Sequence, residues 1–492
     1  MPTLTLTLAH MYPSKAPVLR LPQELLDEIL SDLEHRDLVA LALASRAACA
    51  LVIPRHTEYR VLRTRHLLPA MWAHLARRAD LARNIREVHI CDRANRGASE
   101  RVPRTLVLAE EKKEKEKGKI ADAVEAEARR VRDVCKALGH MRRLHTFTWA
   151  WEVEPPARPT VQPGHENAIF EVLARKKGLR HLGLSGMFGV HAPGAAYDQE
   201  STVYPLWRFS NLTSLSLRGD TWIKPANAPH LKRMLMRSAV SLEYLELPME
   251  FSGLSECKFP YLKRLYLFLQ SGGIRSIDPC VVRFLNAHPA IEELSWLPLG
   301  PVYLSPNMLP ALRRLRTSVQ VAGMLYDCNR LESLDIYQLD PATLVGLKNL
   351  QGARGSVKRV KLHAFGDLAT MYAVAEMFPE LTWLSMPSRY GHFSLEDWLS
   401  LLPRFTKLEV FRGQGLWAAV TLNMQRMHGV IMQLVQLCPN LKQLDHSGHN
   451  QARQDWNRIT IIREGPEGEN VRYRIDRPPP RRWFDALEGA FD

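Results

Sequence analysis

Residues 19–53 read LRLPQELLDEILSDLEHRDLVALALASRAACALVI. Pro22 suits the first turn of a helix, where its missing N–H is not needed. Leu25, Ile29 and Leu33 then recur at helical spacing, and a second apolar run follows them. A helix pair this short cannot bury two apolar faces against itself, although each large aliphatic side chain gains ~1.5–3 kcal/mol on burial. The stretch therefore predicts helices that need a further partner surface.

The spacing of this stretch is specific. Leu21-Pro22-x-Glu24-Leu25-Leu26-x-Glu28-Ile29-Leu30-x-x-Leu33, followed by Asp37-Leu38-x-x-Leu41 and by Ser45-Arg46, resembles an F-box. The F-box is a three-helix motif that docks a protein onto the Skp adaptor of cullin-RING ubiquitin ligases. Many F-boxes carry a Trp shortly after Ser-Arg, where this chain has four small residues at 47–50. The alternative is an amphipathic helical cap. The resemblance implies that these residues bind the adaptor: Leu21, Pro22, Leu25, Ile29, Leu33, Leu38 and Leu41.

Composition indicates a large globular protein. The 492 residues are 46% hydrophobic and 24% charged, with a formal net charge of +14 that is spread thinly along the chain. No basic arm or block makes nucleic acid the default partner, although the sequence pI of about 9.5 leaves it as a weaker hypothesis. The charge favours acidic partners only mildly.

The cysteines and the hydropathy pattern point to the cytoplasm or the nucleus. The seven cysteines form no C-x-x-C pair and are odd in number, so neither a disulfide framework nor a zinc site is predicted. The N-terminus lacks the charged segment and long apolar run of a signal peptide, and no run of ~18 apolar residues predicts a membrane span.

A short pattern recurs along the rest of the chain: an aliphatic residue, two others, an aliphatic, one other, an aliphatic. Near-copies begin at Ile85 and Leu179 and continue at intervals of 19 to 33 residues to Leu441. The last two aliphatic positions alternate as in a strand with one buried face, and helical runs closed by Pro follow several copies. The series resembles leucine-rich repeats, which stack into a solenoid.

We therefore predict an α/β architecture: a three-helix F-box followed by an irregular horseshoe-shaped solenoid with a parallel concave sheet. Leu245, Leu265, Leu334 and Leu384 are predicted core positions. The two strand patterns near the C-terminus, separated by PEGEN, predict a β-hairpin that caps the sheet. The predicted divisions are a tail at 1–18, the F-box at 19–63, a helical linker at 64–84, the solenoid at 85–450 with insertions at about 92–140 and 187–205, and a hairpin cap and tail at 451–492.

No constellation of residues predicts an enzyme or a cofactor site. Gly413 to Ala418 matches G-x-G-x-x-A, but the match lies inside the repeat series, with no acidic residue placed to bind a ribose. The sequence has no Walker A loop, no H-E-x-x-H and no G-x-S-x-G. We expect no catalytic residue, no metal and no cofactor.

The predicted concave face offers a binding surface instead. Side chains that alternate with the buried leucines point off the sheet, and Arg and aromatic residues are frequent binding anchors. Arg314 and Arg316 lie on one predicted strand, and Arg359 and Lys361 lie on the next but one, so the two pairs of cations should stand ~10 Å apart. Four cations this close favour an acidic or phosphorylated target, because guanidinium groups bind carboxylate and phosphate. The predicted target-binding residues are Arg264, Tyr266, Arg314, Arg316, Arg359, Lys361, Trp383 and Arg412.

Proteins of this build resemble the substrate receptors of Skp–cullin–F-box ubiquitin ligases. The resemblance implies that the F-box binds the adaptor, and through it cullin, while the repeats hold a target protein for ubiquitination. The alternative is a leucine-rich-repeat scaffold that binds proteins without directing their degradation.

Overall fold

The computed structural model describes most of the chain. The residues described are 21–22, 25–26, 29–30, 33, 35–53, 56–57, 59–64, 69–90, 123–151, 165–186, 188, 204–270, 277–325, 328–387, 393–420, 424–450, 455–464 and 470–477. The predicted insertion at 187–205 and the tail beyond 477 lie almost entirely outside them.

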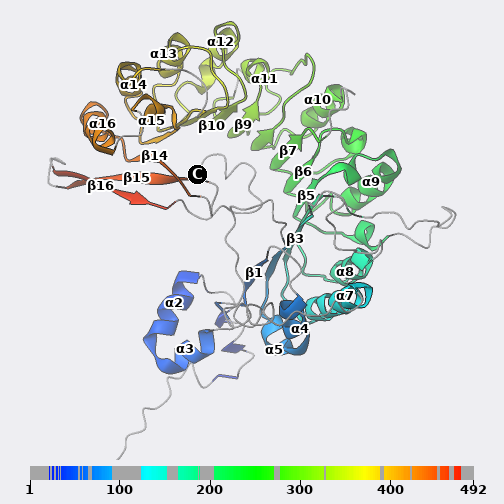
Figure 1. Ribbon diagram of the computed structural model, residues 1–492. Helices are drawn as coiled ribbons and strands as arrows, with labels where there is room; N and C mark the ends of the chain where they lie inside the picture. The colour runs from blue at the N-terminus through cyan, green and yellow to red at the C-terminus, as the bar shows by residue number, and fades with distance from the viewer. Residues whose placement is uncertain are drawn as a thin grey trace, which may run out of the picture.

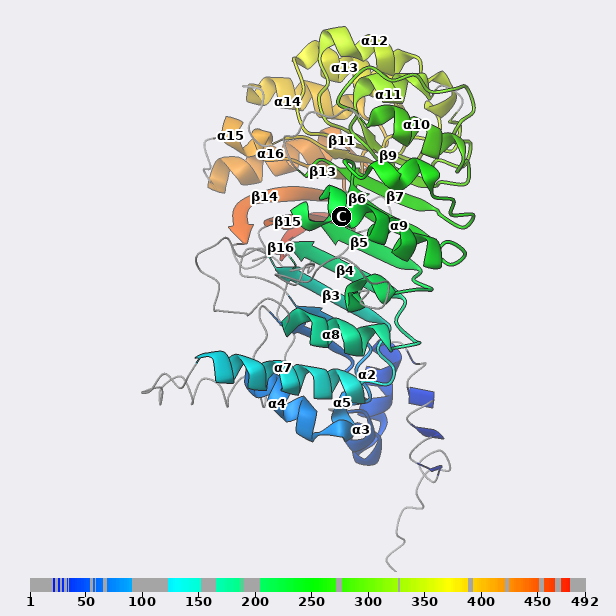
Figure 2. The same ribbon diagram turned by 90° about the vertical axis from the view of Figure 1, so that its right-hand side faces the viewer.

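One continuous sheet organises the molecule. Its sixteen strands lie in the order in which they occur along the chain, and β1 to β14 pair in parallel. The strands line the inside of an arch and the helices line its outside, as Figures 1 and 2 show. This is the predicted horseshoe with a parallel concave sheet, because parallel neighbours need a crossover that returns over one face.

Most of the strands are short, and they recur at irregular intervals along the chain. They are β1 (Val61–Thr64), β2 (Glu87–Ile90), β3 (Thr146–Trp151), β4 (His181–Gly186), β5 (Ser214–Arg218), β6 (Tyr244–Pro248), β7 (Arg264–Phe268), β8 (Glu293–Ser295), β9 (Arg314–Thr317), β10 (Ser333–Ile336), β11 (Arg359–Leu362), β12 (Trp383–Ser385), β13 (Val410–Arg412), β14 (Gln443–Asn450), β15 (Asp455–Glu464) and β16 (Asn470–Asp476).

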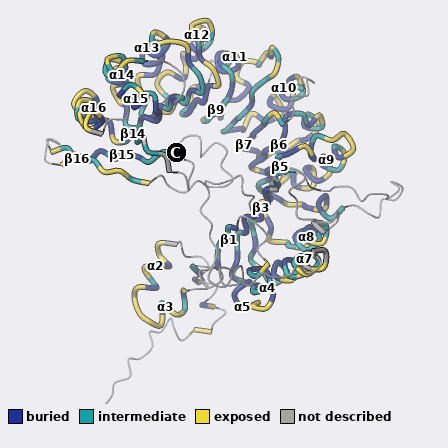
Figure 3. Tube along the Cα trace, viewed as in Figure 1, coloured by how far each residue is buried: buried dark blue, intermediate teal, exposed yellow. Residues whose placement is uncertain are grey.

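An apolar ladder runs through the sheet. The second residue of each strand from β1 to β13 pairs in register with the second residue of the next and is at most 2% exposed. Leu245, Leu265, Leu334 and Leu384 belong to it and are fully buried, which confirms the predicted core positions. The strand positions on either side face the hollow of the arch, since side chains alternate along a strand. Figure 3 shows the parallel strands largely buried and the outer faces of the helices exposed.

Helices cover the outer face of the sheet. The longer ones are α4 (Pro69–Arg77), α7 (Ala123–His140), α8 (His165–Ala174), α9 (Ala228–Arg237), α10 (Asp278–Asn286), α11 (Val319–Met324), α12 (Pro341–Lys348), α13 (Leu368–Met377), α14 (Leu395–Leu401) and α16 (Met424–Leu437). Short 3-10 helices, such as η2 (Pro205–Arg208) and η5 (Ser252–Glu256), replace them in some repeats.

Two predicted boundaries are corrected by the sheet. The solenoid begins at β1, not at residue 85, so β1 belongs to a first repeat whose outer helices are α4 and α5 (Ala79–Ala82). α7 packs between α4 and α8 and is therefore a regular outer helix, although residues 123–140 were predicted to belong to an insertion. Residues 91–122, the rest of that insertion, lie outside the described residues.

The C-terminal end of the sheet is closed by the predicted hairpin. β15 pairs antiparallel with β14 and β16 pairs antiparallel with β15, which reverses the direction of the last strands. Ile459 and Ile461 extend the apolar core into β15. Arg472 and Arg474 on the edge strand β16 oppose pairing with another chain. Among the described residues no helix is long and apolar enough to cross a bilayer.

Candidate functional site

The N-terminal segment presents two faces of one helix. Leu25, Leu26, Ile29 and Leu30 are helical, and the pairs four residues apart share a face. Leu26 and Leu30 are buried, whereas Leu25 is 47% exposed and Ile29 is 45% exposed. The half-exposed apolar pair Leu25 and Ile29 corresponds to the surface that the sequence predicted for an adaptor.

The remaining predicted adaptor-binding residues divide between the surface and the core of the motif. Leu21 and Pro22 are exposed. Leu38, on α2 (His35–Ala44), is fully buried in a small core with Leu30 and Val52, so it is not part of the exposed surface that direct adaptor binding needs. Leu33 and Leu41 are partly buried against the same core. These three leucines stabilise the motif itself, and their effect on a partner is indirect.

Sequence reasoning missed three apolar residues on the same motif. Val39 and Leu43 lie four residues apart on α2 and are 40% and 82% exposed, and Ile53 follows α3 (Arg46–Val52) and is also exposed. The i, i+4 spacing of Val39 and Leu43 was the available signal. They extend the exposed apolar surface beyond the first helix.

Small residues are sufficient to form the third helix of the motif. Ser45 accepts a hydrogen bond from the backbone N–H of Ala48 at 3.0 Å, which caps the start of α3. Ala48 and Val52 are buried beneath this helix. The four small residues at 47–50 therefore fit the motif without the Trp found in many F-boxes.

Arg60 joins the helical motif to the first strand of the solenoid. Its Nη1 donates to the carbonyl oxygen of Leu33 at 2.8 Å and its Nη2 to that of Leu30 at 3.4 Å. Arg60 directly precedes β1, and its own carbonyl accepts from the backbone N–H of Arg86 in front of β2. A charged donor thus satisfies carbonyl groups at the end of the first helix and attaches that end to the sheet.

The predicted target-binding residues occupy the two rows of the concave face. Arg264, Arg314, Arg359 and Trp383 begin their strands, and the other four lie two residues after such a position. Arg314 and Arg359 flank Ser333 in register, and Arg316 and Lys361 flank Asp335. The predicted arrangement of two cationic pairs around β10 is therefore confirmed at the level of strand register.

Three of these eight residues are buried, so their prediction as accessible binding anchors is wrong. Tyr266 and Trp383 belong to an apolar cluster on the concave face together with Tyr244. The Tyr244 and Tyr266 rings lie 5.1 Å apart, and the Arg264 guanidinium lies 5.0 Å from the Tyr244 ring centre. Arg412 is buried as well, where its Nη2 donates to Gln443 Oε1 at 2.8 Å and its Nη1 lies 3.4 Å from Asp445.

Neighbouring acids offset the cations on β9. Arg314 lies 3.2 Å from Glu293 on β8, and Arg316 Nε lies 3.6 Å from Asp335 on β10. The other Asp335 oxygen bonds His363 Nε2 at 2.7 Å. The β9 arginines are thus flanked by one acid each, and their predicted mutual repulsion is reduced. Of the second pair, Arg359 is exposed and Lys361 is partly buried.

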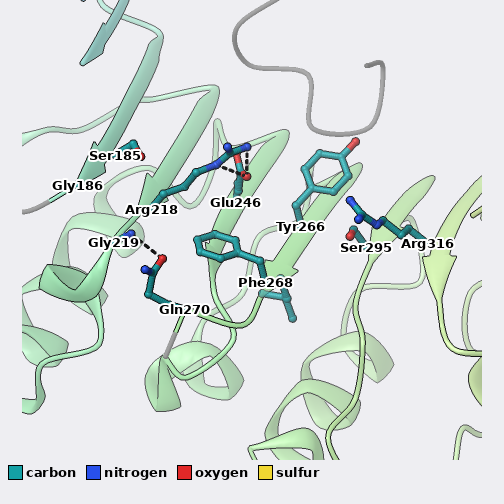
Figure 4. A pocket seen from close by; sticks show the side chains of 11 residues that line it. Ser185, Gly186, Arg218, Gly219, Glu246, Tyr266, Phe268, Gln270, Ser295 and Arg316 are labelled. Carbon is teal, nitrogen blue, oxygen red and sulfur yellow. Dashed lines mark hydrogen bonds and ion pairs between the residues drawn. The ribbon is translucent and has the colours of Figure 1, made fainter. Parts of the chain in front are cut away.

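A pocket lies at the carboxyl ends of β4 to β9 on the concave face. Its volume is about 600 Å³, and Figure 4 shows it from close by. Backbone at the ends of β4 and β5 forms one wall, where Gly219 has a φ of 113° and a Cβ would meet the Gly186 carbonyl oxygen at 2.4 Å. The side chains that line the pocket include Arg218, Glu246, Tyr266, Phe268, Gln270, Ser295 and Arg316.

A buried carboxylate fixes one side of this pocket. Glu246 is 2% exposed and accepts from Ser216 Oγ at 2.5 Å, from the Tyr244 hydroxyl at 3.1 Å and from Arg218 Nε at 2.7 Å. Burial, followed by the Glu246 charge, raises the pKa of Tyr244 well above its usual range, so this hydroxyl remains a donor. The Arg218 guanidinium is therefore held in one position, while 40% of the side chain stays accessible.

Metal-ligating side chains are not clustered in the part of the chain that the structure describes. No group of three or more His, Cys, Asp or Glu among them could hold a metal ion. Gly413 and Gly415 of the G-x-G-x-x-A match serve packing: a Cβ on Gly415 would lie 2.8 Å from the Trp398 ring. The following helix, α15 (Gly415–Ala419), has only five residues.

Comparison with known proteins agrees with this architecture. Residues 18–53 match the F-box domain family. A comparison with curated proteins found no match. Among solved structures, a leucine-rich-repeat protein of Leptospira interrogans aligns with 12% identity over 63% of this chain and 92% of that one, at a TM-score of 0.29. That similarity is too low to carry an argument.

The fold and the exposed surfaces define a protein-binding solenoid with a helical docking motif at its N-terminus. The chain carries an F-box domain at residues 18–53, followed by repeats that form a solenoid of the leucine-rich-repeat type. F-box domains bind the Skp adaptor of Skp–cullin–F-box ligases, and both parts of the chain are binding-type domains.

Proposed function

We propose that this chain is the substrate-recognition subunit of a Skp–cullin–F-box ubiquitin ligase, acting in the cytoplasm or the nucleus. The observation that carries the proposal is the pairing of two different surfaces in one chain. Leu25 and Ile29 present apolar side chains on the F-box, and the solenoid presents a polar concave pocket. The first surface suits a constitutive helical partner, and the second suits a segment of another protein.

The proposed mechanism requires no bond chemistry from this chain. A receptor that holds a target beside the ubiquitin-transferring machinery raises the effective concentration of target lysines there. The Arg60 contacts support this role because they attach the end of the first F-box helix to the sheet that carries the pocket.

The competing function is that of a scaffold that binds proteins without directing their degradation. Proximity labelling in cells, with and without inhibition of cullin ligases, separates the two. A receptor should co-purify with both the adaptor and cullin, and its labelled partners should accumulate when the ligase is inhibited. Co-purification without cullin, with partner levels unchanged by inhibition, would support the scaffold instead.

A further inference from the structure

The pocket at the carboxyl ends of β4 to β9 has an arginine at each end. Arg218 enters from β5 and Arg316 from β9, with aromatic side chains of β7 between them (Figure 4). The two arginines differ in their surroundings. Glu246 holds Arg218 through Nε and Nη2, at 2.7 and 2.6 Å. The Arg316 guanidinium makes no hydrogen bond to any residue that the structure describes, and its side chain is 31% exposed.

Asp335 does not satisfy Arg316. The closest approach, 3.6 Å from Nε to Oδ2, is longer than a hydrogen bond. Asp335 is fully buried, its Oδ1 is bonded to His363, and its Oδ2 has no hydrogen-bond partner among the residues that the structure describes. The guanidinium therefore keeps its donors for another acceptor, while the buried carboxylate stabilises its charge.

The floor between the arginines supplies an apolar surface and further donors. The partly buried Phe268 ring lies at the centre of the view in Figure 4. The Gln270 side chain accepts a hydrogen bond from the backbone N–H of Gly219 at 2.9 Å through Oε1. Its side-chain nitrogen, Nε2, has no acceptor among the described residues. Ser295, at the end of β8, also lines the pocket, and its hydroxyl makes no hydrogen bond to a described residue.

The distance across the sheet sets the length of a ligand. β5 and β9 are separated by four strand spacings of ~4.8 Å, or ~19 Å along the sheet. A segment in the polyproline II conformation advances ~3.1 Å per residue with about three residues per turn, so residues i, i+3 and i+6 share one face and together span this distance. A chain that crosses the strands in this way would place one side chain at each arginine and one over Phe268.

We propose that this pocket binds an extended acidic segment of a target protein, with two carboxylate residues six positions apart and an apolar side chain midway between them. The inference rests on the proposed function and specifies its substrate class. A guanidinium fork matches a carboxylate geometrically. Glu246 and Asp335 already place one negative charge beside each arginine, so a singly charged carboxylate suits the site better than a dianionic phosphate.

The test uses the purified full chain and a fluorescein-labelled peptide, GDSSFSSDG, in fluorescence polarisation at two salt concentrations. The expected result is saturable binding that weakens at high salt and at least tenfold when both Asp residues are replaced by Asn. Shortening the spacing by two residues should weaken binding similarly. Arg316→Gln should weaken binding at least tenfold, because it removes the charged fork without removing any hydrogen bond within the described chain.

The matched control is Arg330→Gln, an exposed arginine three residues before the amino end of β10, whereas the pocket lies at the carboxyl ends of the strands; this variant should change affinity less than twofold. Equal effects of the two variants, or equal binding of the Asp and Asn peptides, would overturn the inference. Tighter binding when phosphoserine replaces both Asp residues would overturn the choice of carboxylate.

The same preparations separate this inference from the proposed function. Arg316→Gln should leave Skp adaptor binding unchanged. Loss of peptide binding with intact adaptor and cullin binding would remove the inference alone. Peptide binding without any adaptor binding would leave the pocket in place and remove the proposed ligase function.

Discussion

Glu246 is the residue at which a single substitution should test the electrostatic design of the concave face. Its carboxylate is buried and serves three donors from three neighbouring positions: the Ser216 hydroxyl, the Tyr244 hydroxyl and the Arg218 guanidinium. Glu246→Gln preserves shape and one acceptor oxygen but removes the charge. Glu246→Ala removes both acceptor oxygens that this side chain offers to the three donors.

The magnitude follows from these contacts. A hydrogen bond to a charged group contributes ~1.5–3 kcal/mol, and the Arg218 share is discounted because that side chain is 40% exposed. We expect Glu246→Gln to lower the free energy of unfolding by about 1–2 kcal/mol, since both hydroxyls can rotate to accept from the amide. We expect Glu246→Ala to lower it by about 2–4 kcal/mol.

Urea unfolding, followed by tryptophan fluorescence and circular dichroism, measures both losses. Glu332→Gln is the matched control, because Glu332 pairs with Arg313 at 2.7 Å on the surface, with both side chains about half exposed. That pair should contribute no more than ~1 kcal/mol. If Glu246→Gln and Glu332→Gln cost the same within error, the buried network does not stabilise the fold as argued.

The other predictions concern the core, the pH response and the F-box attachment. Leu334→Ala should lower the free energy of unfolding by ~2–5 kcal/mol and Val345→Ala, on an exposed face of α12, by less than ~0.5 kcal/mol, as measured in urea. Burial lowers the pKa of His288, whose Nε2 accepts from the Phe259 backbone N–H at 2.9 Å. The neutral His288 ring therefore contributes its full stabilisation above the unfolded pKa of about 6.5, and this stabilisation is lost as pH falls towards the lower folded pKa. His288→Gln should flatten the pH dependence of the free energy of unfolding measured between pH 7 and 5. Arg60→Met should speed hydrogen exchange in the first F-box helix several-fold while the strands exchange as in the wild type; unchanged exchange there would show that Arg60 does not hold the helix.

The repeats could be read from the sequence because alternation of aliphatic residues fixes which strand face is buried. β1 escaped detection because Thr64 replaces the last aliphatic residue of the pattern. Thr317 occupies the same position in β9 and is equally buried, so Tyr59-x-x-Leu62-x-Thr64 was a recognisable variant. α7 could be predicted as a helix but not placed, since helical periodicity does not reveal which helices it packs between.

The two surfaces could be predicted only in part. Leu25 and Leu26, and likewise Ile29 and Leu30, are all apolar, so composition alone does not say which pair faces the motif's own core. Concave partners also lie far apart in sequence: Arg218 and Glu246 are 28 residues apart and meet only through the register of β5 and β6. Arginines that looked like a repelling set in sequence are therefore flanked by acids in the folded chain.

The binding surface on the F-box is the point on which the whole account depends, and direct titration of the purified chain with purified Skp adaptor tests it. The wild type should form a stoichiometric complex, and Leu25→Asp with Ile29→Asp should abolish it, because two charges would be buried in an apolar interface. The double variant should retain the circular dichroism spectrum and urea midpoint of the solenoid. Undiminished adaptor binding by a correctly folded double variant would contradict the account.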